Sequence, residues 1–218
     1  MENFVVKSSR HHALFFATLA FFMGFAGVSA YGPIVPMLKK ILSLDPFFMS
    51  LLAAAPALTG SLLRIPFGAM VDKTGGKRPI IILLALSAAG IAGMAWLTSL
   101  PKDVQVTMYG FFIGFGMLAG CGIAVFSVGV PVVSYWFPQK AQGSALAIYG
   151  GLANMAPGLF ALLLPFLIIK FGFGHSYIIW LSMLILTGLS IALFMHDAPS
   201  FQLKTNGHHV DHNNELHK

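Results

Sequence analysis

The chain has 218 residues, of which 57% are hydrophobic and only 9% are charged. Soluble domains contain about 25% charged residues, so this composition excludes an ordinary soluble enzyme or nucleic-acid-binding domain and predicts a polytopic membrane protein. The net charge is +6. Most basic residues of the chain lie in short turns between apolar runs, where they act as topology signals rather than as a phosphate-binding patch. The single cysteine, Cys121, allows no internal disulfide.

Six apolar runs long enough to cross a bilayer follow one another along the chain. They cover residues 14–36, 46–71, 79–100, 106–136, 141–169 and 177–195. The connections between them are short, so neighbouring helices must run antiparallel and the fold class is predicted to be an all-α, six-helix transmembrane bundle. The first run ends in Val28-Ser29-Ala30 and can also be interpreted as a signal peptide. The five runs after it favour an uncleaved first helix.

Prolines indicate several helix ends. Asp45-Pro46 is typical of an N-cap followed by a first-turn proline, and Pro138 is predicted to end the fourth helix. We therefore expect three segments: a cytoplasmic N-terminal segment over 1–13, the transmembrane bundle over 14–196, and a disordered, His-rich cytoplasmic tail over 197–218.

The distribution of lysine and arginine predicts the orientation in the membrane. With the N-terminus inside, the inner segments before the tail carry six basic residues and the outer loops carry four. The inner set is Lys7, Arg10, Lys73, Lys77, Arg78 and Lys140, and the outer set is Lys39, Lys40, Lys102 and Lys170. We therefore expect a multi-pass protein of the cell membrane with both termini in the cytoplasm.

The sequence contains few signals of catalytic or metal chemistry. No Ser/His/Asp or Cys/His array, zinc-ligand spacing or phosphate loop is present, and Gly75-Gly76-Lys77 is too short for a phosphate loop and follows no strand. His208, His209 and His212 lie within five residues and could hold a metal ion, but nothing orders these ligands, which favours a solvated tail. We therefore predict that the protein is not an enzyme and has neither a cofactor nor a metal site.

Arg64 lies deep inside the second apolar run, roughly 10–12 Å along a helix from Asp72. An arginine at the centre of a membrane span costs about 2.5–3.5 kcal/mol on insertion scales. No acidic residue falls inside any predicted span, so Arg64 has no carboxylate partner at its depth and the usual carboxylate proton relay is missing. An unpaired guanidinium predicts a site for a flat oxyanion. The alternative is a structural arginine bonded to backbone carbonyls of a neighbouring helix.

The fifth run carries neutral polar and small residues on one helix face. Gly150, Asn154 and Gly158 recur every four residues, with Gly151 beside them. The Asn154 amide can donate to an anion, and the glycines let a ligand approach. Close helix packing through small residues explains the same spacing equally well.

Two GxxxG repeats, Gly110/Gly114 and Gly116/Gly120, lie in the fourth run. Such repeats favour tight helix crossing, and packing alone explains them. Phe126 follows the repeats, and its position in the sequence alone indicates a lipid-facing or core residue rather than one that contacts a ligand.

The stretch GAMVDKTGGKR, residues 68–78, resembles the G-x-x-x-D-[RK]-x-G-x-[RK]-[RK] turn between helices 2 and 3 of major facilitator superfamily transporters. It matches at each defined position: Gly68, Asp72, Lys73, Gly75, Lys77 and Arg78. The resemblance implies a twelve-span transporter in two pseudo-symmetric halves with the substrate site between them, of which this chain resembles the first half over residues 14–195. It also implies that the turn, together with the second half, gates the cytoplasmic face.

Within that superfamily, three features resemble the nitrate/nitrite porter family. Arg64 in LLRIPFG maps onto the substrate arginine of helix 2. Gly150-Gly151-Leu152-Ala153-Asn154 is similar to a helix-5 signature, although that signature usually contains more glycine. Counting back from the helix-4 exit WFPQKAQGSALAIYG places Phe126 where the family has an aromatic residue that sandwiches the planar anion. The second family arginine, from helix 8, and the helix-11 end against which Asp72 is expected to lock have no counterpart in this chain.

The resemblance thus implies transport of nitrate or nitrite, by uptake or exchange, through alternating access in a lipid bilayer. The partners it implies are the anion and either a second half-transporter or a second copy of the chain, with no nucleic acid. Two alternatives stay open. One is a truncated relative that transports nothing or acts as a membrane interaction protein, and the other is a transporter of a small organic anion.

Overall fold

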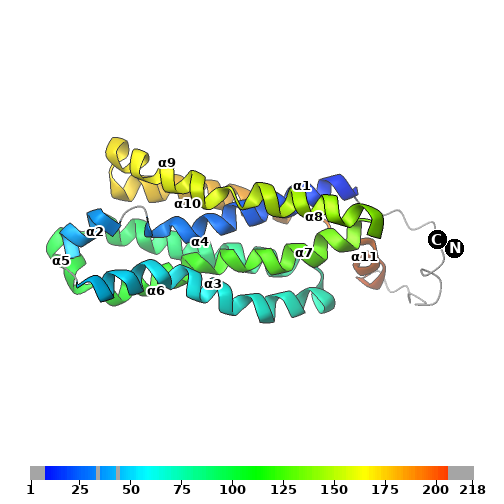
Figure 1. Cartoon of the computed structure of the whole chain (residues 1–218), viewed down its shortest axis with the longest axis horizontal. Helices are drawn as coiled ribbons and strands as arrows, with labels where there is room; N and C mark the ends of the chain where they lie inside the picture. The colour runs from blue at the N-terminus through cyan, green and yellow to red at the C-terminus, as the bar shows by residue number, and fades with distance from the viewer. Residues whose placement is uncertain (1–7, 33–34, 43–44, 206–218) are drawn as a thin grey trace.

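The computed structural model describes residues 8–32, 35–42 and 45–205, which are helical and contain no strand. Six helical segments in this part of the chain are long and apolar enough to cross a membrane. They are Arg10–Ala30, Pro46–Thr74, Lys77–Ser99, Tyr109–Trp136, Gln139–Phe171 and Phe173–Phe194. The segments lie alongside one another in an elongated bundle (Figure 1). The predicted all-α, six-span fold is therefore confirmed.

Several spans consist of more than one helix. The first combines α1 (Arg10–Phe25) with a 3₁₀-helix, η1 (Ala26–Ala30), and the second and third are α3 (Pro46–Thr74) and α4 (Lys77–Ser99). The fourth combines α6 (Tyr109–Gly120), η3 (Cys121–Ala124) and α7 (Val125–Trp136). The fifth combines α8 (Gln139–Ala153) with α9 (Ala156–Phe171), and the sixth is α10 (Phe173–Phe194).

The predicted helix-end signals hold. Asp45 is the N-cap of α3 and Pro46 is its first residue. The fourth span ends at Trp136, and Pro138 becomes the N-cap of α8. The first helix begins at Arg10 rather than at residue 14, because the Ser9 side chain accepts a hydrogen bond from the His12 backbone N–H and caps the helix.

Three short helices lie mainly in segments that we predicted to be connections between spans or a disordered tail. They are α2 (Val35–Leu42), α5 (Lys102–Thr107) and α11 (Pro199–Thr205). The prediction of a disordered tail starting at Asp197 is thus wrong for the part described up to Thr205, where the Ala198 carbonyl accepts hydrogen bonds from the Phe201 and Gln202 backbone N–H groups. The three histidines considered as metal ligands lie outside the described residues.

The two GxxxG repeats behave differently. A Cβ on Gly116 would overlap the ring of Tyr31, and one on Gly120 would overlap the backbone of Pro56 in α3. These two glycines therefore permit close packing, as predicted. The repeat at 110 and 114 faces open space within the described chain, since no atom lies within 4 Å of a Cβ built at either position. The packing prediction is wrong for that pair.

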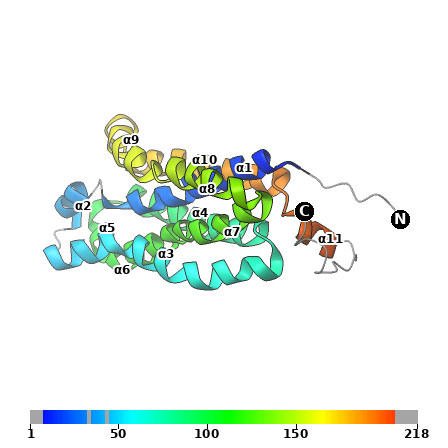
Figure 2. The same ribbon diagram turned by 45° about the vertical axis from the view of Figure 1, so that its right-hand side comes forward.

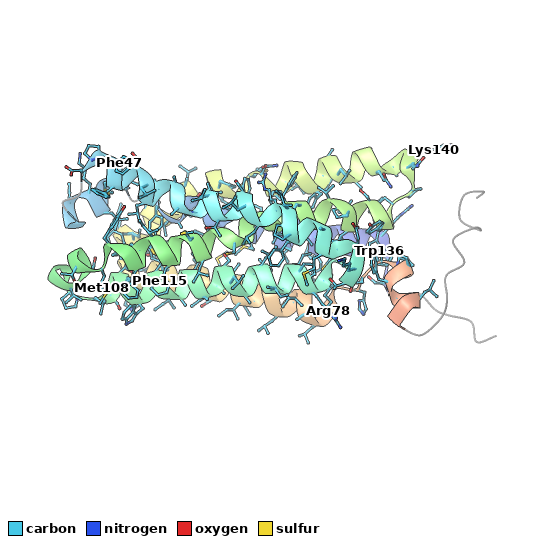
Figure 3. The ribbon with its side chains drawn as sticks, turned by 90° about the horizontal axis from the view of Figure 1, so that it is seen from below. Phe47, Arg78, Met108, Phe115, Trp136 and Lys140 are labelled. Carbon is cyan, nitrogen blue, oxygen red and sulfur yellow. The ribbon has the colours of Figure 1, made fainter. Side chains whose placement is uncertain are left out.

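One end of the bundle gathers the charged turn and the last helix. Figures 1 and 2 show α11 beside the α3–α4 and α7–α8 connections, with α2 and α5 at the opposite end. In Figure 3, Arg78, Trp136 and Lys140 lie at the same end as α11, and Phe47 and Met108 lie at the other. We call the first of these the α11 end.

Candidate functional site

Arg64 lies in the second span and packs on an aromatic ring of the fourth. Its ζ-carbon is 5.3 Å from the centroid of the Phe126 ring, within the range of a cation–π interaction. The two helices are joined at this level by Ser127, whose hydroxyl donates to the Arg64 carbonyl at 3.0 Å and to the Ala124 carbonyl at 2.9 Å. The structure therefore brings Arg64 and Phe126 together, although they are far apart in sequence.

The Phe126 ring is held by further aromatic residues from other spans. Its centroid lies 5.2 Å from that of Phe21 in α1, and it stacks on Tyr149 of α8 at 6.3 Å with an interplanar angle of 17°. The buried Tyr149 hydroxyl donates to the carbonyls of Val125 and Phe126, each at 3.1 Å. A Cβ on Gly129 would overlap that hydroxyl, so glycine at 129 makes room for Tyr149. Phe126 thus forms an ordered platform under Arg64.

The hydrogen-bonding capacity of Arg64 is not used up by the chain. Its Nε is buried and has no hydrogen-bond partner in the described structure. Asp72, in the last turn of α3, is the only acidic residue within the six described spans. The Arg64 side chain is half-buried. Its cation–π contact contributes about 0.5–2 kcal/mol, which roughly offsets the cost of about 1–3 kcal/mol for leaving the buried Nε–H unpaired. Arg64 therefore keeps the capacity to bind an anion.

Asn154 and its glycines lie on an open face. Asn154 follows the last residue of α8, is exposed, and donates its side-chain amide to the Gly150 carbonyl at 2.6 Å. A Cβ on Gly150 would meet only that amide nitrogen, at 3.9 Å, and one on Gly151 or Gly158 would meet nothing within 4 Å. No described helix of this chain packs closely on these glycines. The hydrogen bond of Asn154 is thus made within its own helix, and no hydrogen bond joins it to Arg64 in the described structure.

The predicted gating turn is ordered by the chain around it. The sequence predicted that Asp72 and Lys73 lie in a loop. In the structure the second span continues to Thr74, so both residues belong to the last turn of α3. The Asp72 carboxylate accepts a hydrogen bond from the Tyr135 hydroxyl at 2.6 Å. Gly75 has a φ of 77°, a conformation that favours glycine. Gly68 needs no such explanation, because a Cβ there would make ordinary contacts with Ser127 at 3.6–3.7 Å.

The sequence reasoning missed several residues that shape these two regions. Tyr149 directly precedes Gly150, and a hydroxyl inside an apolar run was a signal that could have identified it. Ser127 directly follows Phe126 and carries the same kind of signal. Tyr135 and Asp197 contact the turn from distant parts of the chain and leave no local pattern.

The comparisons with known proteins agree with this architecture. The family model of the Major Facilitator Superfamily matches residues 16–212. The chain belongs to this superfamily. It is a multi-pass membrane protein, and the predicted resemblance is confirmed by relatives that are named as nitrate or nitrite transporters.

Three of these relatives show the extent of the match. This superfamily member is 28% identical over 191 residues to the probable nitrate/nitrite transporter NarK2 of Mycobacterium tuberculosis (strain ATCC 25618 / H37Rv), covering 87% of the chain and 46% of the relative. It is 30% identical over 192 residues to the probable nitrate transporter NarT of Staphylococcus carnosus (strain TM300), covering 86% and 45%. It is 36% identical over 118 residues to the nitrate/nitrite transporter NarU of Escherichia coli (strain K12), covering 54% and 25%. The chain therefore spans less than half the length of these relatives.

Proposed function

We propose that this chain is one half of a transporter that moves nitrate or nitrite across the membrane by alternating access. The observation that carries the proposal is Arg64, whose guanidinium lies over Phe126 while its buried Nε has no partner. A planar guanidinium donates two parallel hydrogen bonds to a flat oxyanion, which a point charge cannot do. The names of the relatives point to the same class of anion.

Each predicted site residue has a proposed task. Arg64 supplies the charge, and Phe126 supplies the flat apolar surface against which a planar anion lies. Gly150 and Gly151 leave space on the face of α8, since no atom crowds a Cβ built there. Asn154 donates to the anion once its side-chain amide leaves the Gly150 carbonyl, to which it is now bonded.

A second six-helix half, or a second copy of the chain, is proposed to cover the open face. The α3 side chains of Leu62 and Ile65, which flank Arg64, are 63% and 80% exposed, and Leu152 beside Gly151 is 53% exposed. The relatives have more than twice the length that the chain matches. Rocking of the two halves about the site then gives alternating access. The basic residues gathered at the α11 end favour a cytoplasmic location for that end.

Nitrate uptake into lipid vesicles tests the proposal. The chain is reconstituted alone and together with the second half of the Mycobacterium tuberculosis relative NarK2. We expect uptake when both halves are present. Arg64→Ala should lower it by about 100-fold or more, since hydrogen bonds to charged groups contribute about 1.5–3 kcal/mol each and two are lost. Arg64→Lys should restore only part of the activity, because lysine lacks the planar fork.

Lys170→Ala is the matched control, because it removes a positive charge that also lies over an aromatic ring, 5.2 Å from the Phe171 centroid. It should leave uptake unchanged. Wild-type uptake by Arg64→Ala, or no uptake by any combination of halves or copies, would overturn the proposal. A lack of uptake by every combination would favour the alternative that this chain is a truncated relative of the transporters that transports nothing. Preference for formate or acetate over nitrate would identify a transporter of small organic anions.

A further inference from the structure

A carboxylate from the segment after the sixth span caps the helix that follows the gating turn. Asp197 Oδ1 accepts a hydrogen bond from the Lys77 backbone N–H at 2.8 Å, across 120 residues of sequence. Lys77 is the first residue of α4, and the N-cap position is Gly76, which offers no side chain. Asp197 therefore satisfies an N–H group that the helix itself leaves unpaired, and its negative charge lies at the positive end of the helix dipole.

The turn is shaped to receive this carboxylate. A Cβ on Gly75 would lie 2.6 Å from both Cγ and Oδ1 of Asp197, and Gly75 also has the positive φ of the turn. A Cβ on Gly76 would overlap the side chain of Val132 in α7. Both glycines are buried. The two consecutive glycines thus let Asp197 and α7 close on the turn from two sides.

Asp197 is itself held in place by the helix that follows it. The Gln202 side-chain amide of α11 donates to the Asp197 carbonyl at 2.7 Å. Phe201, on the same helix, lies with its ring centroid 5.7 Å from that of Tyr135, whose hydroxyl binds Asp72. The segment 197–205 therefore supports both ends of the turn. Asp197 binds the start of α4 directly, and Phe201 packs on Tyr135 of α7, which binds Asp72 at the end of α3. Figure 3 shows α11 at the end of the bundle where Arg78 and Trp136 lie.

We propose that Asp197 is a positioning residue for the gate, an inference that rests on the proposed transport function. Its carboxylate, supported by α11, fixes the backbone of the Gly75-Gly76 turn, so that Asp72, Lys77 and Arg78 are presented to the second half in one arrangement. A surface that is ordered before it meets its partner loses less conformational entropy on closure. Without Asp197, the first N–H of α4 loses its partner and two glycines with wide conformational freedom lie next to it.

Hydrogen–deuterium exchange of the purified chain in detergent micelles tests the positioning without any need for transport. Asp197→Ala should raise the exchange rate of amides in the first turn of α4 by about tenfold or more, because a hydrogen bond to a charged group is lost. Asp197→Asn keeps an acceptor oxygen and should raise the rate less. The matched control is Asp45→Ala, which alters an exposed N-cap aspartate that makes no side-chain capping bond. It should leave the α4 amides unchanged.

Nitrate uptake by the paired halves tests the consequence for gating. Asp197→Ala should lower the maximal rate several-fold and leave the half-saturating nitrate concentration unchanged, because Asp197 does not touch the anion. Wild-type exchange at α4 in Asp197→Ala would overturn the positioning role, and faster exchange with an unchanged uptake rate would overturn its link to the gate. If Asp197→Ala does not fold, Asp197→Asn decides by the same two measurements. If the wild-type pair takes up no nitrate, the proposed function fails and with it the gate, whereas the exchange rates still decide whether Asp197 orders the turn.

Discussion

Two regions of this protein differ in how completely the chain provides hydrogen-bond partners for their charged and polar side chains. At the α11 end, Asp72 binds the Tyr135 hydroxyl and Asp197 binds the Lys77 backbone N–H. In the middle of the second span, the Nε of Arg64 has no partner. The Asn154 amide, from the candidate anion site, bonds only within its own helix.

If the chain works as the proposed half-transporter, this contrast separates a turn that the chain orders by itself from a binding site that it leaves incomplete. The turn is closed by contacts among α3, α4, α7 and α11, all of them in this chain. The candidate anion site has an ordered platform in Phe126 and a charge in Arg64, but the face of α8 beside it is open. The proposed half-transporter predicts this contrast, because the substrate site of two-halved transporters lies at the interface between the halves.

The largest difference in stability between the two regions should appear when a methyl group is added to a glycine of each. Gly76→Ala places a Cβ into the side chain of Val132 and should lower the free energy of unfolding by about 1–3 kcal/mol, as overpacking does elsewhere. Gly151→Ala meets no atom within 4 Å and should change it by less than about 0.5 kcal/mol. Denaturant titration of each purified variant in mixed micelles measures both. Equal effects of the two substitutions would contradict the comparison.

The bond between Tyr135 and Asp72 should make a smaller contribution to stability. Tyr135→Phe removes a hydroxyl that donates to a carboxylate oxygen at 2.6 Å, and Tyr135 is 46% exposed, so we expect a loss of about 1 kcal/mol. A double-mutant cycle with Asp72→Asn, followed by the same titration, isolates the pairwise term. A coupling energy near zero would show that the turn does not depend on this contact.

Removing the guanidinium should have the smallest effect on stability. Arg64→Met keeps an unbranched apolar stem and eliminates a buried N–H without a partner, so we expect a change in unfolding free energy within about 0.5 kcal/mol of zero, or a slight gain. Met155→Leu, at an exposed position near the open face, is the control for a volume-conserving change. A loss of more than about 1 kcal/mol for Arg64→Met would favour the structural-arginine alternative, since such losses come from broken native contacts.

The sequence was sufficient for the features that depend on local composition. Long apolar runs predicted the six spans, and Asp45-Pro46 and Pro138 marked helix ends because N-caps and prolines act within a few residues. The short helices α2, α5 and α11 were missed because they contain no membrane-length apolar run. The two GxxxG repeats are alike in sequence, yet only Gly116 and Gly120 face neighbouring helices, because helix rotation in the bundle decides which side meets a partner.

The sites depended more on long-range contacts, and the sequence predicted less of them. The lack of a carboxylate near Arg64 is visible in the sequence, but its proximity to Phe126 followed only from the resemblance to a known family. The structure shows that proximity, whereas the binding roles of Arg64, Phe126, Asn154, Gly150 and Gly151 stay predictions. The bond of Asp197 to Lys77 spans 120 residues, and no spacing rule connects them.

That bond also sets a practical boundary for anyone who wishes to divide such a transporter into separately expressed pieces. Hydropathy would place the cut directly after the sixth span, at Phe194 or Met195. A piece cut there would lack Asp197, the acceptor for the first N–H of α4, and Phe201, whose ring packs on Tyr135. The helices that these residues contact, α4 and α7, would still be intact. A six-helix piece that keeps both contacts must therefore continue past the end of α10 at Phe194 to include Asp197 and α11 (Pro199–Thr205).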